Sequence, residues 1–272
     1  IPIFLFAVVV VMISGAGATM KQYFGLPHYV GAAFMAILVL VTNMLGLKRL
    51  VDIIGSLGPI TIIFTIVIAA VALIKNPGGL ANVSEAMRQV GELPRATSSG
   101  TAWWLAGTLY VAYNVTGSIP FLAEMGKGAV TKKEAVLGAV VGAVALMTSG
   151  LLLNLALLSY LGDIAGLDIP NLYFADLITP AFGMIFSIIL LCEIFSTAAP
   201  MLWVSANKIG KEGTSRNKIA VIILTIFAFF GGQLPFGMLI GTVYPYTGYL
   251  GIIVLVTITI KVFADRKKLS IK

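Results

Sequence analysis

One apolar stretch of the chain contains polar and helix-breaking residues whose types suit ligand binding at membrane depth. It spans Thr101–Gly126 and reads TAWWLAGTLYVAYNVTGSIPFLAEMG. Gly117 weakens a helix, and Pro120 has no amide hydrogen to donate to the carbonyl of Thr116, four residues earlier. Irregular backbone at this depth is tolerated only inside protein or against a water-filled cavity, so we expect a helix break at Gly117 and Pro120 that exposes backbone to a ligand. The expected substrate-binding residues are Tyr113, Asn114, Val115, Thr116, Gly117 and Ser118. The alternative is an ordinary proline kink in which the hydroxyls of Thr116 and Ser118 bond back to the helix.

A second polar cluster lies deep in another apolar stretch, LLCEIFSTAAPMLWV. Glu193, Ser196 and Thr197 stand at i, i+3 and i+4, so they share one face of a helix. A carboxylate near the middle of a membrane span is costly and by default indicates function. Glu193 could carry a proton, or it could bind a cation together with the two hydroxyls, since hard cations prefer oxygen ligands. We expect these three residues to couple an ion, with Na⁺ at Ser196 and Thr197 as one candidate. The alternative is a structural hydrogen bond from Glu193 to a neighbouring helix.

Other kinds of chemistry lack the residues that they need. The sequence has no His/Cys set at metal-ligand spacing, no nucleophile elbow and no phosphate-binding loop. We therefore expect no enzyme activity and no cofactor other than a coupling Na⁺. The single cysteine, Cys192, excludes an intrachain disulfide. The expected partners are a small-molecule substrate and the lipid bilayer, and the oligomeric state stays open.

The elements that must position both clusters are membrane helices. The 272 residues are 59% hydrophobic and 11% charged, whereas soluble domains carry about 25% charged residues. Because a span needs about 20 apolar residues and must satisfy its own backbone, eight segments are expected to be helices, and the chain is expected to be an all-α polytopic membrane protein. The eight segments are Ile1–Met20, Tyr29–Gly46, Leu50–Ile74, Thr101–Ala123, Glu134–Leu161, Pro180–Ile209, Asn217–Leu234 and Phe236–Val262.

The basic residues predict the orientation of these spans. Fourteen of the 18 Lys and Arg residues fall on one side of the expected membrane. They are Lys48, Arg49, Lys127, Lys132, Lys133, Lys208, Lys211, Arg216, Lys218, Lys261, Arg266, Lys267, Lys268 and Lys272. Because basic loops stay in the cytoplasm, both ends of the chain are expected to face the cytoplasm at the plasma membrane. This placement also accounts for the net charge of +7 without a nucleic-acid partner.

The connections predict one transmembrane domain over residues 1–272. The outer loop 75–100 is expected to hold a short surface helix around Asn82–Val90, and the acidic loop Gly162–Thr179 a partly helical cap. Residues 263–272 are expected to be a cytoplasmic tail. The chain starts inside an apolar run without Met or a basic leader, so we expect an N-terminally truncated fragment.

Three of the stretches resemble a known family of membrane proteins. SGAGA in the first span, GTLYVAYNV…IPFLAEMGK in the fourth and CEIFSTAAPMLW in the sixth resemble the YkvI-type bacterial membrane proteins, a branch of the amino acid–polyamine–organocation superfamily with the LeuT-like fold. The resemblance implies two inverted five-helix repeats, of which residues 1–74 would hold the last three helices of the first and residues 101–262 the whole second repeat. The eight spans would be the third to tenth helices, with the fourth of this chain discontinuous. It also implies that Ser196 and Thr197 occupy a sodium site on the eighth helix.

Together these expectations describe a cation-coupled secondary transporter. It would use Na⁺ or H⁺ to move a small amino-acid-like or amine solute by alternating access. A different class remains open, a membrane receptor or sensor that keeps the same fold and binds the solute without transporting it.

Overall fold

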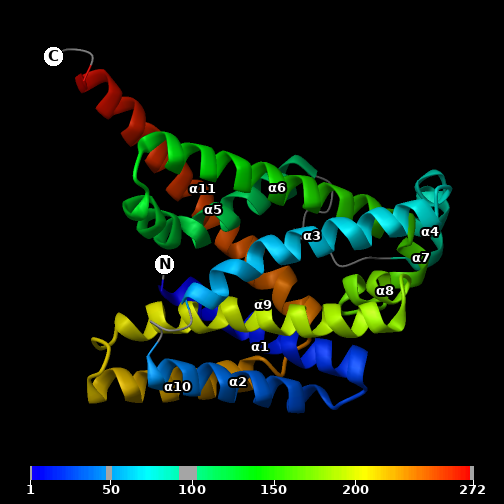
Figure 1. Cartoon of the computed structure of the whole chain (residues 1–272), viewed down its shortest axis with the longest axis horizontal. Helices are drawn as coiled ribbons and strands as arrows, with labels where there is room; N and C mark the ends of the chain where they lie inside the picture. Colours follow the sequence, from blue (N-terminus) through cyan, green and yellow to red (C-terminus); the bar gives the residue numbers. More distant parts are fainter. Residues whose placement is uncertain (1, 47–50, 92–102, 270–272) are drawn as a thin grey trace.

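The structure is a computed structural model that describes residues 2–46, 51–91 and 103–269, and every regular element in these ranges is a helix (Figure 1). The longer helices are α1 (Pro2–Phe24), α2 (His28–Leu45), α3 (Val51–Lys75), α5 (Trp103–Gly128), α6 (Lys132–Ser159), α9 (Pro180–Asn207), α10 (Ser215–Gly231) and α11 (Phe236–Leu269). The shorter ones are the 3-10 helix η2 (Gly79–Asn82) and the helices α4 (Val83–Val90), α7 (Leu161–Ile164) and α8 (Pro170–Asp176).

Each of the eight expected segments corresponds to one long helix. Among the described residues, six of these helices are long and apolar enough to cross a membrane, namely α1, α2, α3, α6, α9 and α11. The other two are α10, which has 17 residues, and α5, which carries the polar cluster. The short surface helix and the helical cap expected in the two loops are confirmed as α4 and α8.

Three of the long helices begin in the same way, with a threonine that caps the first turn. The hydroxyl oxygens of Thr131, Thr179 and Thr214 accept the amide hydrogens of residues 134, 182 and 217 at 3.1, 3.1 and 3.2 Å. Each bond satisfies one of the amide donors that a helix start leaves without a partner. These caps fix where α6, α9 and α10 enter the membrane region.

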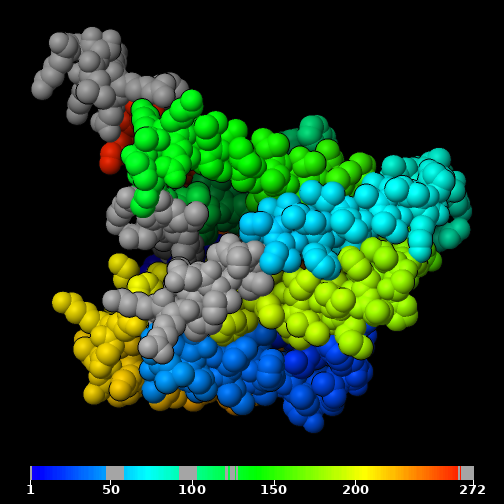
Figure 2. Space-filling view, viewed as in Figure 1, coloured from blue at the N-terminus to red at the C-terminus, as the bar shows by residue number. Residues whose placement is uncertain are grey.

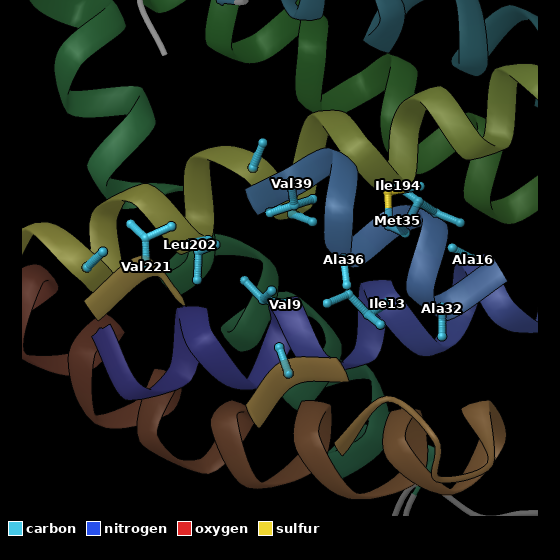
Figure 3. Packing of buried hydrophobic residues seen from close by; sticks show 14 of the residues in the cluster. Val9, Ile13, Ala16, Ala32, Met35, Ala36, Val39, Ile194, Leu202 and Val221 are labelled. Carbon is cyan, nitrogen blue, oxygen red and sulfur yellow. The ribbon is translucent and has the colours of Figure 1, made fainter. Parts of the chain in front are cut away.

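Helices α1, α2, α9 and α10 pack against one another and form what we call the four-helix block. Its core is made of buried aliphatic and methionine side chains (Figure 3). Those labelled there are Val9, Ile13, Ala16, Ala32, Met35, Ala36, Val39, Ile194, Leu202 and Val221. Small residues let the backbones meet, because a Cβ on Gly31 would lie 2.7 Å from the carbonyl oxygen of Ala16.

The remaining long helices form two pairs beside the block. α3 packs along α6, and α5 along α11 (Figures 1 and 2). The second contact, which we call the α5–α11 pair, is close because of two glycines. A Cβ on Gly248 would lie 3.0 Å from the carbonyl oxygen of Leu109, and one on Gly251 would lie 2.5 Å from that of Ala112. α3 also contacts α9, and α11 also contacts α1, so each pair packs against the block.

The two ends of the molecule hold different elements. The α5–α6 and α9–α10 connections lie toward the same end as both chain termini (Figure 1). At the opposite end, α7 and α8 form a cap that side chains from two long helices hold in place. The Gln22 side chain accepts from the amide of Ile169 at 2.8 Å and donates to its carbonyl at 2.7 Å. Lys75, the last residue of α3, donates to the carbonyl of Leu177 at the end of α8.

The expected helix break is not present. α5 runs as one α-helix from Trp103 to Gly128, through both Gly117 and Pro120. The alternative was an ordinary proline kink with hydroxyls that bond back to the helix. It fits better at Ser118, because the hydroxyl of this residue donates to the carbonyl of Val115 at 3.0 Å. The physical reason for continuity is that a proline costs a helix only one amide donor, and the close contact with α11 supports the helix at Leu109, Ala112 and Thr116, before that position. The structure describes the backbone of Pro120 but not its side chain.

Candidate functional site

A cavity of about 540 Å³ lies where α1, α5, α9 and α11 meet. Its wall combines aromatic, small polar and aliphatic side chains. They are Phe4, Val8, Tyr110, Tyr113, Asn114, Gly117, Ser118, Thr197, Met201, Ile240 and Tyr244. This volume lies within the range of small-molecule sites, about 300–1,000 Å³. The cavity brings four of the expected substrate residues together with one expected ion residue.

Helical periodicity positions the lining of this cavity. On α5, Tyr110, Tyr113 and Gly117 stand at i, i+3 and i+7, so they share one face of the helix. The other three helices each contribute a pair of residues four positions apart. These pairs are Phe4 and Val8, Thr197 and Met201, and Ile240 and Tyr244. These three helices therefore each contribute about one turn to the wall, and α5 contributes about two.

Three tyrosines form the aromatic side of the wall. The rings of Tyr113 and Tyr244 stack, with centroids 4.8 Å apart and planes 29° apart. Tyr110 meets Tyr113 edge to face, with centroids 5.4 Å apart. Such geometries add to the stability of an aromatic pair beyond the area that it buries. The stack joins α5 to α11 across the cavity wall.

Gly117 serves close packing in place of the expected break. A Cβ at this position would lie 3.3 Å from the ring of Phe4 on α1, which is tighter than an ordinary contact. The absence of a side chain therefore lets the aromatic ring of α1 reach the wall of the cavity beside α5.

Thr116 and Val115 do not line this cavity. Thr116 lines a second cavity of about 260 Å³, together with Phe4, Thr247, Leu250, Ile253 and Val254. It is 5% exposed, and its hydroxyl has no hydrogen-bond partner. The reason is the approach of α11, since Gly251 presents its bare Cα to this hydroxyl. Of the expected substrate residues, four thus line the larger cavity, Thr116 lines the smaller one, and Val115 lines neither.

The three expected ion-coupling residues have different partners. The side chain of Glu193 lies near that of Thr61 on α3. The hydroxyl of Ser196 donates to the carbonyl of Glu193 in its own helix at 2.8 Å. Thr197 lines the larger cavity. Although they share a helix face, one points to a neighbouring helix, one to the backbone and one to the cavity.

Several lining residues were not expected from the sequence. Tyr110 could have been found, because it stands one turn before Tyr113. Tyr244 had a similar signal, since it directly precedes Pro245 inside an apolar helix. Phe4 and Met201 carried no signal, because an aromatic or thioether side chain in an apolar run is ordinary core. Thr61 on α3 was also not expected, because a hydroxyl in the middle of a span was the only feature that set it apart.

Comparison with known proteins relates the chain to an uncharacterised membrane protein. It is 26% identical over 252 residues to the "Uncharacterized membrane protein YkvI" of Bacillus subtilis (strain 168), and the match covers 91% of this chain and 68% of that protein. No family model matches the chain. No solved structure matches it either. The similarity supports a YkvI-like membrane protein. With the apolar helices, it indicates a multi-pass helical membrane protein.

Proposed function

We propose that this YkvI-like chain is a cation-coupled secondary transporter that uses Na⁺ or H⁺ to move a small amino-acid-like or amine solute by alternating access. The observation that carries the proposal is the cavity between α1, α5, α9 and α11. It lies among apolar helices, and polar side chains from α5 and α9 line it. Polar groups at membrane depth are costly, and cavities that they line are where transporters hold their solutes.

The packing of the helices supports a LeuT-like inverted repeat. If α1 is exchanged with α9, α2 with α10 and α3 with α11, the contacts between the helices map onto one another. The α1–α10 contact becomes the α9–α2 contact, and the α3–α9 contact becomes the α11–α1 contact, and all four are present. α3 and α11 also each carry an internal proline, Pro59 and Pro245, in corresponding parts of the helix. Repeats that enter a membrane from opposite sides produce this kind of pattern. In that fold α1 to α3 are the third to fifth helices, and α5, α6, α9, α10 and α11 are the sixth to tenth.

The arrangement of charge supports an orientation. Lys132 and Lys133 begin α6, and Lys208 and Lys211 lie between α9 and α10, so these basic residues gather at the end of the molecule that also holds the termini (Figure 1). By the positive-inside rule this end faces the cytoplasm, and the α7–α8 cap faces outward at the plasma membrane.

Glu193 is the proposed coupling residue. It stands near the middle of α9, far from either helix end, and one turn before the cavity residue Thr197. Its side chain lies near Thr61, where α9 of the four-helix block contacts α3. Protonation, or a cation held by the carboxylate, would change the charge at this contact and so change how α3 sits against α9. Binding of the ion and movement of a helix are then linked at one residue.

Transport by the full-length protein in liposomes tests the proposal. A mixed panel of amino acids and amines is offered with an inward Na⁺ gradient, an inward H⁺ gradient or neither. We expect uptake driven by one gradient, and its loss in Glu193→Gln, which keeps the size but removes the charge. Glu85→Gln is the matched control, because Glu85 is an exposed carboxylate on α4, and it should transport normally.

Two outcomes would count against the proposal. Saturable binding without uptake under any gradient would reject transport and favour the receptor or sensor. Uptake that continues unchanged in Glu193→Gln would keep the transporter and remove Glu193 from coupling.

A further inference from the structure

A groove of about 350 Å³ runs along α10, apart from the two cavities that α5 lines. Five of the residues that form it stand at i, i+3, i+4, i+7 and i+8 on this helix, a spacing that places them on one face. They are Arg216, Ile219, Ala220, Ile223 and Leu224, and Ile209 of the α9–α10 connection joins them. The groove is therefore cationic at the start of α10 and apolar along the two turns that follow.

The α9–α10 connection is fixed against the first turn of α10. The side-chain nitrogen of the buried Asn217 donates to the side-chain oxygen of Asn207 at 3.0 Å and to the carbonyl of Gly210 at 2.9 Å. The backbones also meet closely, because a Cβ on Gly210 would lie 2.8 Å from the amide nitrogen of Asn217. Ile209, next to Gly210, is thus held beside the start of α10, and a ligand would find the groove already formed.

The charged end of the groove lies in a basic segment. Residues 208–218 contain one acid, Glu212, and four bases, which are Lys208, Lys211, Arg216 and Lys218. The carboxylate of Glu212 accepts a hydrogen bond from the indole of Trp203 at 3.1 Å, so it is already engaged by α9. The positive end of the α10 dipole lies at the same place. These charges favour an anion, and the Arg216 guanidinium suits a phosphate because two of its N–H groups can bind two phosphate oxygens.

A groove on α6, at the same end of the molecule, provides a contrast (Figure 1). It also has a basic residue ahead of apolar ones, but the carboxylate of Glu134 follows directly after Lys133 in its wall. Opposite charges side by side leave that end with little net attraction for a phosphate. In the α10 groove, the charged residue among those described is Arg216. The two grooves therefore differ in charge more than in shape.

The length of the α10 groove suits one leaflet of a bilayer. Arg216 and Leu224 stand eight residues apart, a rise of about 12 Å along the helix. Half of the hydrocarbon core of a bilayer is about 15 Å thick. With Arg216 at the membrane surface, the apolar part of the groove stays within the leaflet whose headgroups Arg216 meets.

We propose that the α10 groove binds an acidic phospholipid. Its phosphate is held at Arg216, within the field of the basic segment, and one acyl chain lies along Ile219 and Ile223. Basic pockets beside membrane helices recognise anionic headgroups in this way. The inference is independent of transport, and under the proposed orientation the lipid belongs to the cytoplasmic leaflet.

Native mass spectrometry of the full-length protein tests the inference. The protein is purified in detergent and titrated with phosphatidylglycerol or with phosphatidylcholine that has the same acyl chains. We expect phosphatidylglycerol to bind at least about fivefold more tightly, since one basic side chain near a membrane surface supplies a factor of this order. Glycerol 3-phosphate should not displace the lipid, because it has no acyl chain for the apolar part of the groove.

Variants of the charged end locate the preference. Arg216→Gln should weaken phosphatidylglycerol binding about fivefold, and Arg216→Lys, which keeps the charge, should retain most of it. Lys133→Gln is the matched control, because it removes one charge from the α6 groove at the same end of the molecule. It should bind phosphatidylglycerol as the wild type does.

A second pair of variants tests the apolar part. Ile223→Trp fills the groove and should weaken the binding of phosphatidylglycerol. Ile226→Trp is its control, because Ile226 is 50% exposed on the same helix, close to the 46% of Ile223, but does not line the groove. Melting temperatures show that each variant is folded.

The outcomes decide the inference apart from the proposed function. Equal binding of the two lipids, displacement by glycerol 3-phosphate, or unchanged binding in Arg216→Gln overturns it. An equal loss in Lys133→Gln also overturns it, because the preference would then come from surface charge in general. Gradient-driven uptake is a separate measurement, so failure of the lipid inference leaves the transporter standing, and the reverse also holds.

Discussion

The four-helix block and the α5–α11 pair hold their helices together by different means. In the block, a continuous set of buried aliphatic side chains fills the space between four helices. Both regions contain a glycine contact and a buried polar atom without a partner, at Gly31 and Asn43 in the block and at Gly251 and Thr116 in the pair, but only in the pair do the two cavities that α5 lines lie alongside the contact. Dense packing favours a single arrangement, whereas a contact bordered by cavities leaves room for ligands and for other arrangements. The comparison therefore identifies the block as the scaffold and the pair as the part that adapts.

The largest expected effect tests the block. Leu202→Ala removes a side chain that is 0% exposed at the centre of its core, and should lower the free energy of unfolding by about 2–5 kcal/mol. The control is Leu151→Ala on α6, where the leucine is 61% exposed, and it should change little. Thermal unfolding of the detergent-solubilised protein measures both. Equal effects would mean that the block is no better packed than the surface of α6.

The next effect tests the close contact of the pair. Gly251→Ala places a Cβ 2.5 Å from the backbone carbonyl of Ala112, which cannot rotate away, so the helices must move apart at a cost of about 1–3 kcal/mol. Gly241→Ala on the same helix meets no atom within 4 Å and is the control. The same unfolding assay applies. If Gly251→Ala were as stable as Gly241→Ala, the pair would already separate freely.

A matched pair of threonines sharpens the comparison. Thr116 in the pair and Thr225 in the block are each 5% exposed, but only Thr225 has a bond, from its hydroxyl to the carbonyl of Val221 at 2.8 Å. Thr116→Val removes an unpartnered hydroxyl and should raise stability by about 1 kcal/mol, whereas Thr225→Val should lower it by about 1 kcal/mol. Opposite signs in thermal unfolding support the distinction. The same sign in both would show that the Thr116 hydroxyl has a partner such as water.

The smallest effect concerns the α7–α8 cap, which packs against α9 of the block and against α3 and α6. Burial raises the pKa of the Tyr173 phenol above its usual value of 10.0, and the nearby Asp163 raises it further. The folded cap then holds this proton more tightly than the unfolded chain does, so the stability from Tyr173 is complete below about pH 10 and is lost as the pH rises through the folded-state pKa. We expect Tyr173→Phe to flatten the fall in melting temperature between about pH 9 and 11. An unchanged slope would assign alkaline unfolding to other groups.

The sequence was sufficient for features that depend on neighbours along the chain. Apolar runs predicted all eight long helices, and the outer-loop sequences predicted α4 and α8. Tyr113 and Gly117, which the sequence marked as substrate-binding residues, line the same cavity, and their binding role stays a prediction. The helix predictions succeed because helix formation and the side-chain period of a helix are local properties.

What the sequence could not provide depends on contacts between distant helices. Gly117 and Pro120 suggested a break, but the support that α11 gives to α5 is not visible in either segment. Glu193 and Thr197 share a helix face, yet such a face is wide enough to meet two neighbours. Only the fold shows that Glu193 faces α3 and that Thr197 faces the cavity. Phe4 could be assigned to the cavity wall only once the fold showed that α1 crosses beside Gly117.

Cys192 adds a practical consequence for labelling chemistry. It is the single thiol of the sequence, it is exposed, and it stands beside Glu193 on α9. A lipid-soluble maleimide should reach it in native membranes, whereas a membrane-impermeant sulfonate reagent should not, if this side of α9 faces lipid. Protection from both reagents would instead show that protein covers the thiol or that apolar surroundings keep it protonated, since the thiolate is the form that reacts. One covalent modification can therefore report whether this side of α9 is open to the bilayer.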